Sequence, residues 1–201
     1  MKLPQFNKIV QCNLSLVALA LLLYPNTTQA QEKIEREYAI KATQVPEPAL
    51  QFISQVFTNP RIKWYAEDSQ RGQSIEAKVK RDGTIYSIEF DKTGKLQDIE
   101  TLIKFKSLSE ALREAIEKTL KAEFSRIKID KVQRQWSGPT KTLQLLLAHK
   151  EPEEQYTTRY ELIISGTKEK NTSDYEVLVD DMGKLIRTSK IIYGDNPHLI
   201  F

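Results

Sequence analysis

The sequence has few of the residues on which most catalytic and metal centres depend. It contains one cysteine, Cys12, and two histidines, His149 and His198, that lie far apart in the chain. A zinc site needs three or four converging ligands, and a serine or cysteine nucleophile needs a base within hydrogen-bonding reach. No serine lies in a Gly-x-Ser-x-Gly sequence. The sequence therefore predicts a protein that is not an enzyme and that holds neither a metal nor a cofactor.

Clustered glycines and a strong excess of charge are also missing. The seven glycines form no cluster of the kind that cradles phosphate groups. There are 30 basic and 27 acidic residues, and without Lys2 and Lys8 the basic residues number 28. These charges are interspersed, and no basic stripe emerges that would follow a nucleic-acid backbone. We therefore predict no nucleic-acid partner.

The first thirty residues have the organisation of a secretory signal peptide. Two lysines precede an apolar run over residues 14–24, and Ala30 ends the segment with a small side chain. The run is shorter than the ~20 apolar residues that span a membrane. We predict that residues 1–30 are removed and that the protein is exported without stable membrane insertion; a retained anchor is the alternative. Cys12 would leave with the signal, so the mature chain would form no disulfides.

One segment occurs twice. Residues 86–96 read Tyr-Ser-Ile-Glu-Phe-Asp-Lys-Thr-Gly-Lys-Leu, and residues 175–185 read Tyr-Glu-Val-Leu-Val-Asp-Asp-Met-Gly-Lys-Leu. Alternating apolar positions followed by Asp-x-x-Gly are typical of a strand that runs into a tight turn. The recurrence predicts a structural unit that is built twice rather than a catalytic motif.

The rest of the chain indicates the same duplication. Each copy is predicted to contain a strand, an amphipathic helix and three further strands. The second helix is predicted to begin at a capping box formed by Ser107 and Glu110. Asp82-Gly83 predicts a two-residue type I′ hairpin turn. The second copy carries about 20 extra residues at 137–156, whose leucines predict a short additional helix.

We therefore predict an α+β protein of two tandem units with about nine strands in all. In each unit a helix packs on one face of an antiparallel sheet. The first unit spans residues 31–104, the second spans 105–193 with its insertion, and residues 194–201 form a C-terminal tail. The sequence leaves open whether the two units share one continuous sheet.

Several segments resemble the PepSY-like family of exported bacterial proteins. They are Val45-Pro46 with Ala49-Leu50, the strand Ile62-Lys-Trp64 and residues 86–94, each with its second copy. The resemblance covers nearly the whole mature chain and implies a fold similar to that of the β-lactamase-inhibitory proteins. It also implies a periplasmic or secreted location and an inhibitor-like role, because related domains occur in peptidase propeptides. It brings no catalytic residue. The insertion departs from the simplest family pattern, so the two units need not bind the same partner.

The candidates for binding are Tyr65, Arg134 and Trp136, because exposed aromatic residues beside arginine are frequent interface anchors. Tyr65 follows Trp64, which we expect in the core, and should therefore point away from the helices. By strand parity, Arg134 and Trp136 should lie on the face opposite Ile129. The alternative for Trp136 is that the insertion covers it.

The predicted function is that of an exported, non-enzymatic binding or inhibitor-like protein whose partner is an envelope or secreted protein or peptide. The helix-free face of the sheet is the expected working surface. One alternative is a small-molecule or lipid carrier. Another is an enzyme that uses carboxylates, with Glu76, Glu89 and Glu161 as candidates. Asp180-Asp181 lack the spacing of an EF-hand and are interpreted as a turn rather than a calcium site.

Overall fold

A computed structural model describes residues 31–69 and 72–192; the predicted signal peptide, the predicted tail and His198 lie outside these ranges. Within them the chain forms nine β-strands, three α-helices and two short 3-10 turns. In chain order these are β1 (Gln31–Ile40), η2 (Ala42–Gln44), α1 (Glu47–Val56), β2 (Ile62–Ser69), β3 (Gly72–Arg81), β4 (Thr84–Asp91), β5 (Leu96–Ile103), η3 (Phe105–Ser107), α2 (Glu110–Glu123), β6 (Arg126–Ser137), α3 (Thr140–Leu147), β7 (Thr157–Lys168), β8 (Asn171–Asp180) and β9 (Leu185–Ile192).

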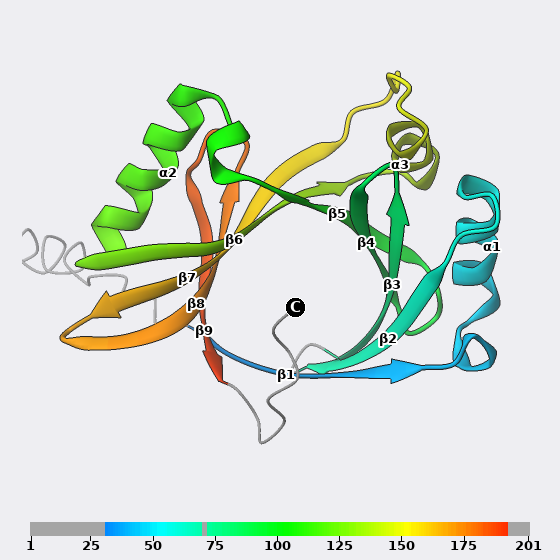
Figure 1. Cartoon of the computed structure of the whole chain (residues 1–201), viewed down its shortest axis with the longest axis horizontal. Coiled ribbons are helices and arrows are strands. Elements are labelled where there is room, and N and C mark those ends of the chain that lie inside the picture. The colour runs from blue at the N-terminus through cyan, green and yellow to red at the C-terminus, as the bar shows by residue number, and fades with distance from the viewer. Residues whose placement is uncertain (1–30, 70–71, 193–201) are drawn as a thin grey trace, which may run out of the picture.

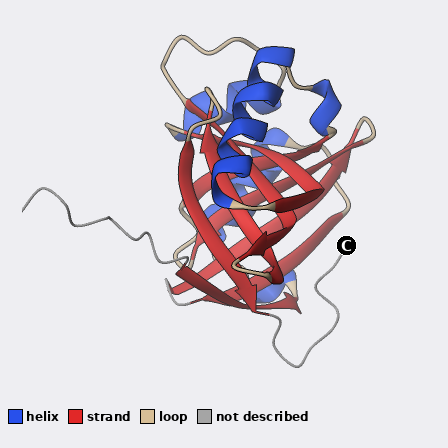
Figure 2. Ribbon diagram, turned by 90° about the vertical axis from the view of Figure 1, so that its left-hand side faces the viewer, coloured by secondary structure: helices blue, strands red, loops and turns tan. Residues whose placement is uncertain are grey.

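All nine described strands belong to one sheet, in which each strand pairs antiparallel with the next along the chain. Gln31–Ile34 of β1 also pair in parallel with Ser189–Ile192 of β9, and this pairing closes the sheet into a cylinder. The strands cross the cylinder at a slant (Figure 2), as strand twist requires. The predicted α+β class with an antiparallel sheet is confirmed, and the sheet is continuous.

The turn between β3 and β4 shows how local sequence sets the register. Asp82 and Gly83 have φ angles of 51° and 80°. Positive φ at both central residues defines a type I′ turn, whose twist matches that of the flanking strands. Arg81 therefore pairs with Thr84, and every later pair of β3 and β4 follows from this one. The predicted hairpin is confirmed.

The hydrophobic core lies between the outer face of the sheet and the helices, which all lie outside the cylinder (Figure 1). One part of the core joins α1 and α3 to β2–β5, and its most buried side chains include Ala49, Ile53, Leu143, Ile88 and Phe90. The other part joins α2 to β6–β9 and includes Ile116, Leu120, Leu162, Ile164 and Val177. The helix predicted in the insertion is α3, and it belongs to the first part.

A cation beside two neighbouring aromatic rings joins the end of α1 to the hairpin of β3 and β4. The rings of Phe57 and Tyr86 lie 6.2 Å apart, and the Arg81 guanidinium lies 5.0 Å and 5.3 Å from their centroids. The same guanidinium donates a hydrogen bond to the carbonyl of Leu147 at the end of α3. Arg81 thus ties both helices of the first core to one turn of the sheet.

We expect Arg81→Met to lower the free energy of unfolding by about 1–2 kcal/mol, because a partly desolvated cation–π contact and a charged hydrogen bond are both lost. Urea denaturation at neutral pH measures the loss. Arg126→Met is the matched control, because Arg126 is exposed and begins a strand without a contact of this kind in the described residues. Equal stabilities of the two variants would contradict the role given to Arg81.

The start of α2 corrects the predicted capping box. Residues Phe105–Ser107 form a 3-10 turn, so the α-helix begins only at Glu110. The capping residue is Ser109, whose side chain accepts a hydrogen bond of 3.3 Å from the backbone N–H of Leu112. A serine two residues later than predicted therefore satisfies a free N–H of the first turn.

A bulge in β6 overturns the parity that was predicted for Arg134 and Trp136. Ile129 pairs with Ile164, but Lys131 pairs with Ile163, so that Asp130 is an extra residue in the strand. One extra residue reverses which face the following side chains occupy. Arg134 and Trp136 consequently lie on the same face as Ile129, toward the helices and not opposite it.

Candidate functional site

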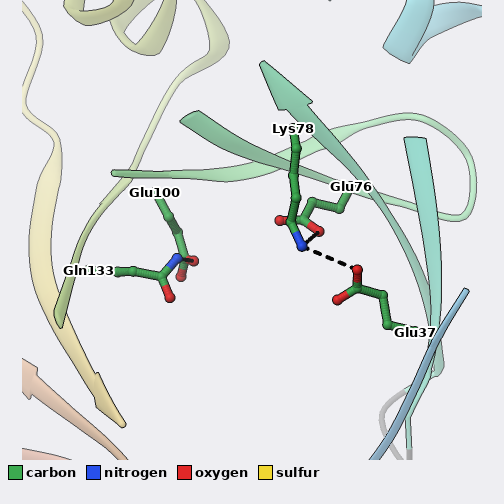
Figure 3. A network of polar contacts seen from close by, with 5 residues as sticks. All are labelled: Glu37, Glu76, Lys78, Glu100 and Gln133. Carbon is green, nitrogen blue, oxygen red and sulfur yellow. Dashed lines mark hydrogen bonds and ion pairs between the residues drawn. The ribbon is translucent and has the colours of Figure 1, made fainter. Parts of the chain in front are cut away.

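The helix-free face of the sheet lines the inside of the cylinder, and we call it the concave face. Residues that are directly opposite on neighbouring strands share a face of the sheet. Ala77, Ile88 and Ile99 face the helices, so the residues that alternate with them along β3, β4 and β5 face inward. The predicted working surface is therefore not an open outer surface, because closure of the sheet turns it inward. Figure 3 shows side chains from four strands projecting into this space.

Three carboxylates come together on the concave face where β4 meets β5: Glu89, Asp98 and Glu100, which we call the carboxylate trio. One oxygen from each lies within 4.8 Å of the others. A β-bulge places them there, since Glu89 pairs with Asp98 while Phe90 pairs with Leu96. Bulges are frequent next to functional sites, where they re-aim side chains.

Two glutamines of β6 hold one side of the trio. The amide nitrogen of Gln133 donates to Oε2 of Glu100 at 2.6 Å (Figure 3). The amide nitrogen of Gln135 donates to Oε1 of Glu100 at 3.2 Å and to Oδ2 of Asp98 at 3.3 Å. Oδ1 of Asp98 is inaccessible to solvent and has no hydrogen-bond partner. The trio is therefore hydrogen-bonded on the side of β6, and Oδ1 of Asp98 is left without a partner.

Burial makes the charged form of the trio costly. Burial raises the pKa of Glu89 and of Glu100 well above the usual value, and the neighbouring carboxylates Asp98 and Glu161 are the next causes for Glu89 and Glu100 respectively. Burial raises the pKa of Asp98 to about 7, although the charge of Arg159 acts in the opposite direction. Full ionisation of the trio is therefore unfavourable unless a cation compensates its charge.

Between β8 and β9, at the position that corresponds to the trio, the buried carboxylate is neutralised by an arginine of the chain. A bulge of the same kind occurs there, with Leu178 paired to Arg187 and Val179 paired to Leu185. Nη2 of Arg187 lies 2.6 Å from Oε1 of Glu176, which is 1% exposed. A buried carboxylate thus has a guanidinium partner in the second bulge, whereas the three carboxylates at the first bulge have no ion-pair partner in the described residues.

A second polar group on the concave face surrounds Lys78 (Figure 3). Its ammonium lies 3.0 Å from Glu76 and 3.1 Å from Glu37. Burial alone would lower the pKa of Lys78, but Glu76 and Glu37 outweigh it and raise the pKa. The ammonium also lies 4.6 Å from the ring centroid of Tyr65. This group is electrostatically compensated, unlike the trio.

Comparison with known proteins gives structural neighbours only. No protein-family model and no curated protein matches the chain. A BLIP-like protein from Bacteroides fragilis NCTC 9343 is similar in structure, with 15% identity, a TM-score of 0.47, and coverage of 77% of this chain and 92% of that one. A DUF2874 family protein from Bacteroides ovatus ATCC 8483 has 14% identity, a TM-score of 0.46, and coverage of 73% and 87%. Because these TM-scores lie below 0.5, the proposals below rest on the residues of this chain.

The three predicted binding residues do not form one site. Tyr65 lies on the concave face, as predicted, while Trp64 is buried in the core. Trp136 is half-buried and packs against the core that contains α3, so the insertion does cover part of it. The Arg134 guanidinium lies 5.8 Å from the centroid of the Trp136 ring. Arg134 and Trp136 therefore belong to the helix side of the sheet, across from Tyr65.

An open pocket of about 570 Å³ lies at the ends of β1 and β2. Its lining is mainly apolar and includes Ile40, Pro60, Ile62 and the two aromatic residues Trp64 and Tyr65. This volume lies within the range of small-molecule sites. Tyr65 is the one predicted binding residue that reaches it.

The carboxylates that the sequence singled out do lie near one another. Glu76 pairs with Glu89 across the hairpin, and the charge of Glu161 acts on both Glu89 and Glu100. Asp98 and Glu100 were not singled out from the sequence, although the Asp-x-x-Gly turn between β4 and β5 brings Asp98 near Glu89.

Two other predicted features lie away from the trio. Asp180 accepts hydrogen bonds from the backbone of Met182 and Lys184, as a turn residue does. His149 is exposed. None of the helices in the described ranges is long and apolar enough to cross a membrane.

Proposed function

We propose that the chain is an exported, non-enzymatic binding protein that receives a basic segment of another envelope protein or peptide on its concave face. The observation that carries this proposal is the carboxylate trio, whose charge has no ion-pair partner within the described residues. A lysine or arginine side chain of a partner would supply the missing charge. Electrostatic complementarity of this kind gives specificity and speeds association.

Apolar side chains at the rim of the concave face support a peptide partner. Ile85 is 47% exposed and Leu102 is 54% exposed. Tyr86 pairs with Thr101, so Ile85 and Leu102 stand at the next step of the same two strands, beside Glu100. We therefore expect a ligand in which a basic residue is flanked by apolar ones.

The assignment as a non-enzymatic protein rests on the surroundings of the trio. Its nearest side-chain partners are glutamine amides, which neither attack a substrate nor carry protons at neutral pH. The described histidine, His149, lies on the exposed end of α3, on the outside of the cylinder. If the protein were an enzyme that uses carboxylates, Glu89→Gln should abolish catalysis. If it is a binding protein, the same variant should change only the affinity for the ligand.

Peptide binding tests the proposal. We expect a fluorescently labelled peptide of alternating lysine and leucine to bind the mature protein, and its glutamate–leucine counterpart not to bind. The double variant Ile85→Ser/Leu102→Ser should weaken binding by about tenfold, as expected when two apolar contacts of a peptide are removed. Fluorescence anisotropy at physiological salt measures both affinities.

Met182→Ser is the control for that experiment. Met182 is 77% exposed, more than Ile85 or Leu102, and it lies in the turn between β8 and β9 rather than at this rim. Its variant should bind as the wild type does. Equal affinity for the lysine and glutamate peptides, or an equal loss in the two variants, would refute binding at the concave face.

A small-molecule carrier is the second candidate, and the pocket of about 570 Å³ beside Tyr65 favours it. An apolar ligand would pack on Trp64 and Ile62 without entering the acidic part of the concave face. Native mass spectrometry of protein purified from its own host would reveal an added mass of bound ligand. A mass equal to that of the bare chain would count against this function.

We further propose that the two halves arose by duplication of a PepSY-like unit and that the signal peptide directs the protein to the periplasm. The Asp-x-x-Gly turns support the duplication: Asp91 caps the backbone of Lys95 as Asp180 caps that of Lys184. The cluster formed by Arg81 and the rings of Phe57 and Tyr86 supports it too. Its counterpart in the second half contains the rings of Phe124 and Tyr175, whose centroids are 4.9 Å apart. The ammonium of Lys168 lies 4.6 Å from the first centroid and 5.8 Å from the second.

A further inference from the structure

We propose that Glu89, Asp98 and Glu100 bind a divalent cation, and that the ion which this site suits is Ca²⁺. The inference concerns the same three carboxylates on which the proposed function rests, and it assigns them a metal ion instead of a basic side chain. A metal titration without peptide tests it separately, so either idea can fail while the other stands.

The separation of the oxygens is compatible with ligands of one calcium ion. One oxygen from each of the three carboxylates lies within 4.8 Å of the others. Oxygens bind Ca²⁺ at about 2.3–2.6 Å, so two ligands of one ion are at most roughly 4.6–5.2 Å apart. Ca²⁺ accepts irregular shells of oxygen ligands, whereas Mg²⁺ demands near-ideal octahedral geometry. A trio of carboxylates on two strands therefore suits Ca²⁺ better.

An unsatisfied oxygen points to a missing ligand independently of this spacing. Oδ1 of Asp98 is shielded from solvent and accepts no hydrogen bond. Buried polar atoms are almost always hydrogen-bonded, so this exception requires an explanation. A cation between Glu89 and Asp98 would give this oxygen a partner.

At the second bulge, between β8 and β9, an arginine of the chain itself neutralises a buried carboxylate. Counting 89 residues on from Glu89, Asp98 and Glu100 leads to Leu178, Arg187 and Ser189. These residues occupy corresponding positions beside the second bulge, where Arg187 pairs with Glu176 at 2.6 Å. The second bulge thus has its own cation, and the first has carboxylates in place of it.

The cations nearest to the trio do not replace that arginine. Arg159 acts on Asp98 and Lys131 acts on Glu100 through their charge. Neither forms an ion pair with the trio within the part of the chain that the structure describes. Their positive charge acts on the trio without an ion pair.

The amides beside Glu100 can complete the coordination. Gln133 and Gln135 now direct their nitrogens at the carboxylates. Rotation of either amide by half a turn would present its oxygen instead, and amide oxygens are ordinary calcium ligands. With water molecules, these oxygens reach the six to eight ligands that Ca²⁺ takes.

Calorimetric titration of the metal-stripped mature protein with CaCl₂ at about pH 7.5 tests the site. We expect one site with a Kd of about 10⁻⁴–10⁻³ M, the range of extracellular calcium modules, and a rise in Tm with added CaCl₂. Glu89→Gln should weaken the affinity at least tenfold. Without calcium its Tm should equal or exceed that of the wild type, which shows that the variant folds.

Glu123→Gln is the matched control, because Glu123 is a half-buried carboxylate on the outside of the cylinder that pairs with Lys168 at 2.7 Å. It should leave the calcium affinity within about twofold of the wild type. No heat and no Tm shift at about 10 mM CaCl₂, a concentration above the expected Kd, would overturn the proposal. An equal affinity of Glu89→Gln for calcium, or a response to MgCl₂ or spermidine as large as that to CaCl₂, would also overturn it.

Discussion

Raising the pH from about 5 to about 8 is expected to lower the free energy of unfolding of the metal-free protein by about 3 kcal/mol through Asp98 alone. The pKa of Asp98 is raised from 3.8 to about 7 in the folded chain. Each unit of difference between the folded and unfolded pKa corresponds to about 1.4 kcal/mol. The shifts of Glu89 and Glu100 have the same direction and add to the slope.

The sign follows from the number of protons that each state binds. Between pH 3.8 and about 7 the folded protein keeps a proton on Asp98 that the unfolded chain releases. The unfolded state therefore binds fewer protons, and stability falls as the pH rises through this window. Asp91 shifts the other way, because Thr93 holds its pKa below the usual value, but this exposed group acts only at lower pH.

Urea denaturation at pH 5 and pH 8 measures the effect, and Asp98→Asn provides the matched variant. Its amide cannot ionise, so the part of the slope that Asp98 contributes should disappear and the variant should be more stable than the wild type at pH 8. A wild type whose stability is flat or rises between these pH values would contradict the burial of an uncompensated trio. So would a variant that is less stable at pH 8.

Much of this site could be derived from the sequence because tight turns fix the register of hairpins. The type I′ turn at Asp82-Gly83 makes Glu76 and Glu89 face each other, and the next turn brings Asp98 opposite Glu89. Only the extra residue in β5 had to be allowed for. Two of the three acids could thus have been placed together from local sequence alone.

The rest depends on contacts between distant segments. Gln133 and Gln135 reach Glu100 because β5 pairs with β6 across the whole of α2, and no local pattern sets that register. The closure of β1 on β9 joins the two ends of the described chain. No glycine or proline marks the bulge at Asp130 in the sequence. Because this one extra residue was not recognised, Arg134 and Trp136 were predicted on the wrong face of the sheet.

Replacing Gly94 by alanine is expected to destabilise the protein by about 3 kcal/mol. Gly94 has a φ of 85°, a conformation that costs an L-residue about 1–2 kcal/mol. Its turn also packs on the start of α1, where an added Cβ would lie 2.9 Å from Cβ of Pro46 and 3.0 Å from the backbone nitrogen of Ala49. The helix would have to move, and overpacking of this kind costs about 1–3 kcal/mol more.

Gly83→Ala separates the two contributions. Gly83 has nearly the same φ, 80°, but an added Cβ would meet nothing within 4 Å. It should therefore cost about 1 kcal/mol, which is the backbone strain reduced by the lower entropy of the unfolded chain. Gly183 should behave like Gly94, because its Cβ would lie 2.9 Å from Ala115 of α2 and 3.0 Å from the nitrogen of Ile116. Chemical denaturation of the three variants measures these costs. If Gly94→Ala and Gly183→Ala cost no more than Gly83→Ala, the turns do not clamp the helices to the sheet. If both cost more by similar amounts, the turn after β4 and the turn after β8 perform the same structural task, although the charges at the two neighbouring bulges differ.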